Sequence, residues 1–240
     1  MTGFRTAMLT AALMFSLAAG AWAQARNYPL ETVTGLTLID AAAAAATLHD
    51  RKGVRITISE DALRRARPES GEVNPLGVLQ GVEFSNGAIE AEIAGMPGPG
   101  AAEGARGFVG IAFRVQEGAD RTYDAFYLRP TNGRAEDQER RNHSAQYVSH
   151  PAWPWFRLRK ESPGRYEAYV DLVPGAWTKV RIDVRGEQAR LYVHDQPQPT
   201  LVVNDLKSGA RGKGGVALWI GPGTIAHFRN LTITPASDAK

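Results

Sequence analysis

The sequence predicts an all-β protein built as a two-sheet antiparallel sandwich. Apolar and polar residues alternate along most of the chain after residue 50, which is the period of a half-buried strand. The strands follow one another at short intervals with Gly or Pro between them. No helix of ten or more residues separates them, which argues against a parallel sheet and for a sandwich or barrel.

The chain begins with the features of a secretory signal peptide. Arg5 precedes the apolar segment Ala7–Gly20, and Ala21-Trp22-Ala23 supplies small residues for cleavage before Gln24. The alternative, a membrane anchor, is disfavoured because the segment is shorter than the roughly 20 residues that span a bilayer. We therefore expect a signal peptide at residues 1–23, a single domain at 24–240, and a periplasmic or secreted protein without a transmembrane segment.

Composition excludes several classes of site. The chain has no Cys, so disulfides, thiolate metal sites and cysteine nucleophiles are excluded. Lys and Arg number 28 against 25 Asp and Glu, a formal net charge of +3. So small an excess does not indicate a nucleic-acid-binding protein.

The first element is ambiguous. Asp40 followed by Ala41–Ala46 has the propensity of a capped helix, because Ala is the best helix former. The turn residues Asp50-Arg51-Lys52-Gly53 lead into a strand, however, and favour a hairpin. We expect a strand here. Asp61–Arg67 is expected to form one or two helical turns.

The remaining elements are expected strands. Asn86-Gly87 is a hairpin signal, and Gly95–Gly107, with five Gly and two Pro, is expected to be an exposed loop. The expected strands are Val54–Ile58, Ile89–Ile93, Val109–Val115, Tyr123–Arg129, Ala145–Ser149, Tyr166–Leu172, Val180–Val184, Leu191–Val193, Val216–Ile220 and Leu231–Ile233.

Two segments carry a family resemblance. Gly214–Ile233 and the pair Trp177–Val184 and Ala189–Val193 resemble strands of the concanavalin-A-like lectin/glucanase superfamily. They are also similar to laminin-G-like modules and to bacterial 3-keto-disaccharide hydrolase-type domains. The resemblance implies a jelly roll from about Val82 to Pro235. It leaves function open, because that superfamily contains lectins, hydrolases and adhesion modules.

The candidate site centres on one polar stretch. Basic and aromatic residues alternate from Arg129 to Lys160, a mixture that suits a sugar-binding loop on a rigid scaffold. If the apolar residues of the neighbouring strands face the core, Arg114, Tyr127, Arg129 and Tyr147 face solvent as one platform. We expect this platform to bind a saccharide on the concave sheet, with Trp153 covering it. The alternative is a solvated sheet face without a ligand.

Catalytic and metal sites have weaker signals. Asp137 and Glu139 could act as general acid and base, although such a run is more often an exposed loop. The E-x-D-x-x-E motif of jelly-roll glucanases is absent, and the histidines lack zinc-ligand spacing. We expect no cofactor. Calcium, frequent in the superfamily, stays open, although no acid-rich calcium loop is present.

Three functions remain possible from the sequence. The first is an exported carbohydrate-binding protein. The second is a glycoside hydrolase or lyase of the 3-keto-disaccharide type, and the third is an adhesion or protein-interaction domain without a sugar site. The sequence does not indicate the oligomeric state.

Overall fold

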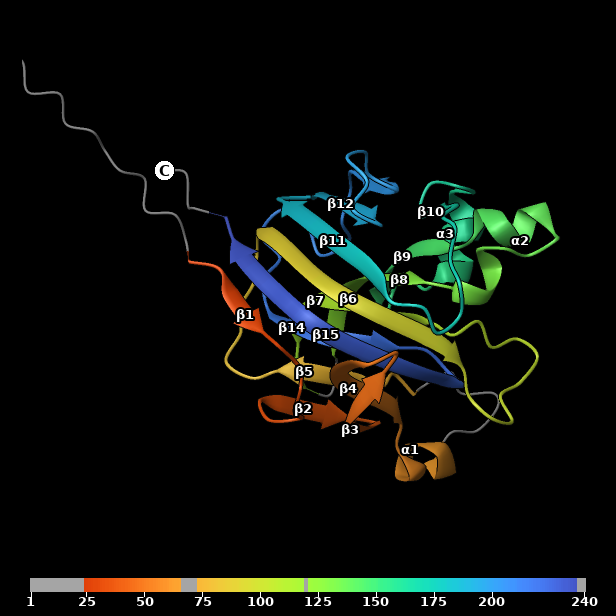
Figure 1. The fold of residues 1–240 in the computed structure, drawn as a ribbon. Helices are drawn as coiled ribbons and strands as arrows, with labels where there is room; N and C mark the ends of the chain where they lie inside the picture. Colours follow the sequence, from red (N-terminus) through yellow and green to blue (C-terminus); the bar gives the residue numbers. More distant parts are fainter. Residues whose placement is uncertain (1–23, 66–72, 119–120, 237–240) are drawn as a thin grey trace, which may run out of the picture.

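The computed structural model describes residues 24–65, 73–118 and 121–236, which form two antiparallel β-sheets packed face to face (Figure 1). The expected signal peptide lies outside these residues. The eight-stranded sheet has the order β13-β12-β11-β6-β15-β4-β3, with β1 also paired to β15. Its strands are β1 (Arg26–Tyr28), β3 (Ala41–Leu48), β4 (Arg51–Ile58), β6 (Gly87–Pro97), β11 (Thr178–Arg185), β12 (Gln188–Val193), β13 (Leu201–Val203) and β15 (Thr224–Pro235).

The second sheet has seven strands in the order β10-β9-β8-β7-β14-β5-β2. These strands are β2 (Leu36–Ile39), β5 (Leu76–Leu79), β7 (Val109–Gln116), β8 (Thr122–Leu128), β9 (Ala145–His150), β10 (Glu167–Ala168) and β14 (Gly215–Ile220). The open two-sheet architecture confirms the predicted antiparallel jelly-roll sandwich.

The core lies between the sheets. Ile111, Phe126 and Leu128 of the seven-stranded sheet face Ile182 and Leu191 of the other sheet. Because side chains alternate between faces along a strand, the neighbours of these residues point away from the core. This assigns Tyr127 to the outer face of the seven-stranded sheet.

The alanine segment Ala41–Ala46 forms an edge strand, as context predicted and propensity did not. It pairs with β4 over its whole length, from Ala41 opposite Ile58 to Leu48 opposite Arg51. The turn places His49 and Asp50 at φ 48° and 60°. Positive φ angles at both central residues define a type I′ turn, whose twist matches that of the two strands it connects.

Two expectations about strands were wrong. Only Glu167–Ala168 of the expected strand Tyr166–Leu172 pairs with a neighbour. Asn86-Gly87 does not turn a hairpin, because the chain passes here from β5 in one sheet to β6 in the other. The Asn86 side chain instead accepts the Gly186 N–H at 2.7 Å.

Short helices lie at one end of the sandwich, beside β9 and β10 (Figure 1). They belong to the stretch expected to be a loop, and they are η1 (Pro130–Asn132), α2 (Gln138–Asn142) and α3 (Trp155–Glu161). A separate helix, α1 (Glu60–Arg65), matches the expected helical turn at Asp61–Arg67 within the residues described.

Candidate functional site

Three neighbouring strands present polar side chains on the outer face of the seven-stranded sheet. Tyr127 on β8 lies opposite Gln146 on β9, and Gln146 lies opposite Glu167 on β10. Residues paired across strands share a face, so these side chains stand side by side. Arg129, two residues after Tyr127, extends the row beyond the end of β8.

Arg129 is held by neutral oxygen atoms. Its Nη2 donates to the Tyr127 hydroxyl at 2.9 Å and to Gln146 Oε1 at 3.1 Å, and its Nη1 donates to the His143 carbonyl at 2.8 Å. The residue is 5 % exposed. Its guanidinium lies over the Tyr127 ring at 5.1 Å and over the Trp155 ring at 5.8 Å. Burial lowers the pKa of Arg129, which remains charged because arginine titrates far above neutral pH.

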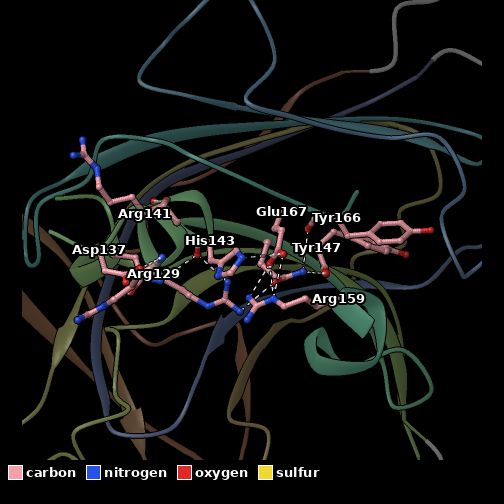
Figure 2. Close-up of polar contacts among 12 residues, drawn as sticks. Arg129, Asp137, Arg141, His143, Tyr147, Arg159, Tyr166 and Glu167 are labelled. Carbon is pink, nitrogen blue, oxygen red and sulfur yellow. Dashed lines mark hydrogen bonds and ion pairs between the residues drawn. The ribbon is translucent and has the colours of Figure 1, made fainter. Parts of the chain in front are cut away.

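Glu167 joins two basic side chains at the centre of the cluster (Figure 2). Arg159, from α3, donates from Nη2 to Oε2 at 2.8 Å and from Nε to both carboxylate oxygens at 3.1 Å. His143 Nε2 lies 3.2 Å from Oε1. The carboxylate therefore fixes the orientation of both side chains. We call Tyr127, Arg129, His143, Gln146, Arg159 and Glu167 the polar cluster.

The polar cluster has an exposed aromatic rim on α3. Trp155 is 43 % exposed and Phe156 is 60 % exposed, and their rings meet edge to face at 5.8 Å. The Arg159 guanidinium lies over Trp155 at 4.8 Å. Exposed aromatic faces next to fixed polar groups are the combination that binds sugars, which present C–H faces and hydroxyl edges.

Protonation states in the polar cluster follow from burial. Desolvation lowers the pKa of His143, with repulsion from Arg159 and Arg129 adding to it, and attraction by Glu167 opposes the shift only in part. The imidazole is therefore neutral at pH 7. With Nε2 donating to Glu167, its Nδ1 is an acceptor. Desolvation also raises the pKa of Tyr127, so its phenol stays protonated.

The expected platform of four residues is only half assembled, and the expectation that it faces solvent was wrong. Tyr127 and Arg129 share the outer face, but both are buried. Arg114 and Tyr147 do not join them. All residues are buried in two segments, Val109–Val115 of β7 and Ala145–Ser149 of β9. The alternation of apolar and polar residues therefore did not indicate which side of these strands faces solvent.

Arg114 ties together turns at one end of the sandwich. It lies at a bulge in β7 with φ 55° and is 2 % exposed. Its guanidinium donates to oxygens of the segments Ser85–Asn86 and Ser208–Gly209 and of the turn at Gly186. These bonds occupy all three of its nitrogen atoms.

Tyr147 points to the core side of the sheet. It lies opposite Phe126, and its hydroxyl donates to Asp124 Oδ1 at 2.6 Å and accepts the Lys207 N–H at 2.9 Å. The residue is 0 % exposed. Desolvation and the neighbouring Asp124 carboxylate raise the pKa of Tyr147.

Among the described residues, Trp153, Asp137 and Glu139 make no hydrogen bond or ion pair with the polar cluster. The Trp153 ring packs between Arg157, at 3.8 Å, and Lys207 Nζ, at 4.7 Å. Asp137 caps α2 by accepting the Arg140 N–H at 2.6 Å, and Glu139 is exposed on that helix. Figure 2 shows Asp137 to one side of the convergence of His143, Glu167 and Arg159.

Sequence reasoning missed Gln146, Glu167 and the site roles of His143, Arg159 and Trp155. The signal for Glu167 was its place in an expected strand two residues before Tyr169. The pairing of β10 with β9 that brings it beside Gln146 is a long-range contact with no sequence motif. Arg159 and Trp155 reach the site through α3, which the sequence did not predict.

Neither a membrane-spanning helix nor a cluster of metal-ligating side chains is found among residues 24–65, 73–118 and 121–236.

Comparisons with known proteins match the fold and not the sequence. No model of a known protein family matches the chain, and no curated protein sequence matches it. Among solved structures, the carbohydrate-binding module CBM66 from Bacillus subtilis is 12 % identical, with a TM-score of 0.53 over 84 % of this chain and 96 % of that one.

Two further structures show the same architecture. A Bacillus subtilis protein of unknown function with a galectin-like fold is 11 % identical, with a TM-score of 0.55 over 88 % of this chain and 96 % of that one. The Crh5 transglycosylase in complex with NAG is 11 % identical, with a TM-score of 0.50 over 90 % of this chain and 86 % of that one. The chain therefore has the concanavalin-A-like sandwich fold that its motifs predicted.

Proposed function

We propose that the protein binds a carbohydrate on the outer face of the seven-stranded sheet, at the polar cluster and the aromatic rim of α3. The observation that carries the proposal is the convergence of Arg129, Arg159 and Glu167 next to the exposed ring of Trp155. Fixed, bidentate hydrogen-bonding groups next to a flat apolar face match the two surfaces of a sugar ring.

Preorganisation supports binding at this place. Each polar side chain of the cluster is held by its neighbours, so little side-chain entropy is lost when a ligand replaces water. The likeness in fold to a carbohydrate-binding module and to a transglycosylase in complex with NAG agrees with a carbohydrate ligand.

The polar cluster supports binding better than glycoside cleavage. Cleavage by acid and base normally needs two carboxyl groups that flank the scissile bond. Glu167 is the one carboxylate within ion-pair distance of the cluster's described residues, and both of its oxygens already accept from Arg159. The proposed site therefore leaves out Asp137 and Glu139, as well as Arg114, Tyr147 and Trp153.

A glycan array followed by calorimetry on the best ligand tests the proposal. Trp155→Ala should weaken binding about 5- to 50-fold, the range of one to two stacking contacts. The matched control is Tyr192→Ala, which removes an aromatic ring from the other sheet and should leave affinity unchanged. Equal affinity of wild type and Trp155→Ala would place the site elsewhere. If the wild type cleaves a glycoside and the Glu167→Gln variant does not, the alternative function of a glycoside hydrolase or lyase is favoured.

Export of the chain is part of the proposal. It rests on the basic, apolar and small-residue pattern of residues 5–23. Amino-terminal sequencing of protein from the periplasm or medium should begin at Gln24. Recovery of intact Met1 from a membrane fraction would contradict it.

A further inference from the structure

The unused hydrogen-bonding capacity of the polar cluster consists mostly of donors. A guanidinium has five N–H groups, and Arg129 uses three of them on the Tyr127 hydroxyl, Gln146 and the His143 carbonyl. Its Nε–H and one Nη1–H have no partner among the described residues. Arg159 points Nε and Nη2 at Glu167, and its Nη1 has no partner in the described part of the chain.

The acceptors in the cluster are already occupied. Both oxygens of Glu167 receive Arg159, and Oε1 also receives His143. The Nδ1 atom of His143 accepts no hydrogen bond from the described residues and can receive one ligand hydroxyl. A group that complements the remaining donors must be rich in acceptor oxygens.

The positive charge of Arg129 has no counter-ion in contact. No carboxylate of the described residues lies within ion-pair distance of it, although Glu167 attracts it from farther away. A buried charge is costly unless it is paired. The neighbouring Arg159 increases the cost by repulsion.

Two more guanidinium groups near η1 also lack a carboxylate contact in the described part of the chain. Arg140 donates to Asn132 and Thr131, and Arg106 donates to backbone carbonyls. Desolvation lowers the pKa of Arg106, and repulsion from Arg140 and Arg129 adds to the shift. The acids nearby are Glu103, Glu139 and Asp137, of which Asp137 is engaged as the α2 cap.

We propose that the saccharide bound by the polar cluster is acidic, and that its carboxylate or sulfate group pairs with the free N–H groups of Arg129 and Arg159. This inference rests on the proposed function. Planar guanidinium groups are suited to two-point contacts with such anions. The side chains of Arg159 and His143 are partly exposed and can be reached from solvent, whereas Arg129, next to them, is buried.

The test compares acidic oligosaccharides with neutral counterparts of the same ring. The probes are oligogalacturonate, oligomannuronate and oligoglucuronate, each with its carboxyl-reduced form, and a sulfated galactan oligosaccharide with its desulfated form. We expect at least one acidic probe to bind about 10- to 100-fold more tightly than its neutral form, the range of a hydrogen-bonded charge pair. The probes that show this preference identify the anion as carboxylate or sulfate.

Variants of the two arginines test whether the preference for acidic probes arises at the polar cluster. Arg129→Gln and Arg159→Gln should each reduce it to less than about threefold, with thermal unfolding measured to verify the fold. Arg159 is the more exposed of the two, so its variant keeps the test valid if Arg129→Gln does not fold. The matched control is Arg134→Gln. The Arg134 guanidinium pairs with Asp171, outside the polar cluster, so this variant should keep the preference for the acidic probes.

The outcomes separate the two proposals. Tighter or equal binding of the neutral forms overturns the inference and leaves carbohydrate binding in place. A preference that survives in both site variants also overturns it. If no acidic or neutral saccharide binds, the proposed function itself fails.

Discussion

Gly110 allows β8 to lie close to β7 beneath the polar cluster. A Cβ atom at this position would lie 2.2 Å from the Phe126 carbonyl oxygen and 2.6 Å from Tyr127 Cα. These are backbone atoms and cannot move aside alone. A side chain here must displace the strand that carries Tyr127 and Arg129.

Gly110→Ala should therefore lower both stability and affinity. We expect the free energy of unfolding to fall by about 1–3 kcal/mol, the usual cost of overpacking, and saccharide binding to weaken. Urea unfolding and calorimetry measure the two effects. Gly104→Ala is the matched control, because its Cβ would meet no atom within 4 Å. Wild-type behaviour of both variants would contradict the close approach.

Arg114 stabilises the fold through the turns it connects. Arg114→Met should reduce the free energy of unfolding by about 1.5–3 kcal/mol, the range for hydrogen bonds to a charged group, because the change removes the donor that joins these turns. The control Arg190→Met, at an exposed position of β12, should change stability by less than about 0.5 kcal/mol. Wild-type stability of Arg114→Met combined with weaker sugar binding would instead support the ligand-binding role predicted from the sequence.

Single residues of the site could be predicted only on strands whose sequence shows clearly which side faces the core. Tyr127 and Arg129 were identified because Phe126 and Leu128 are plainly core residues. On β9 the sequence offers Gln146 and Val148 on one face against Tyr147 and Ser149 on the other. Both faces are buried, and the face between the sheets carries Tyr147, opposite Phe126, rather than Val148. A tyrosine that donates to a buried carboxylate looks the same in sequence as one that meets solvent.

At the scale of elements, the alanine strand shows tertiary pairing overriding propensity. Six alanines favour a helix in isolation, but β3 pairs with β4 along its whole length. The turn residues that follow decided the outcome, and they were visible in the sequence. By contrast, α2 and α3 have five and seven residues, too short for a periodic signal.

The β3–β4 turn offers a direct stability test. Asp50→Gly should raise the free energy of unfolding by a few tenths to about 1 kcal/mol, because Gly adopts the positive φ of 60° without the steric cost of a Cβ. Asp50→Val should lower it by about 1–2 kcal/mol. Thermal unfolding of both variants measures the difference. Equal midpoints would mean that the turn does not limit the stability of this hairpin.

At the scale of the whole molecule, acid should destabilise the protein through its histidines. Desolvation lowers the pKa of His143, His150 and His227 in the folded state. The unfolded state therefore binds protons first as pH falls below about 6.5, the ordinary histidine value. The stabilisation is complete above that pH and is lost as pH falls through the lower folded values.

Unfolding in urea between pH 8 and pH 5 measures this effect. His227→Phe should flatten the slope, because the buried Nδ1 of His227 has no hydrogen-bond partner among the described residues and Phe can fill the place beside Trp177. His194→Phe, at an exposed position after β12, is the comparison variant. Stability that is constant over this range would show that the three imidazoles are accessible to water.

The sandwich as a whole was predictable because its strands repeat one pattern many times, so single errors do not alter the fold class. The strand Tyr166–Leu172 was wrong in extent and Asn86-Gly87 was wrong as a hairpin, yet the two sheets formed as expected. The site has no such redundancy. It depends on a few pairings between distant segments, each of which must be correct.

The stacking of Trp219 on Tyr127 at 4.6 Å, with Trp155 across the Arg129 guanidinium, gives the protein a built-in optical reporter. An indole's fluorescence responds to the charges and water around it. A ligand that pairs with Arg129 changes both for Trp155, whereas Trp177 on the other sheet remains as a constant background. Occupancy of the site can therefore be followed from the protein's own ultraviolet emission, without a label on either partner.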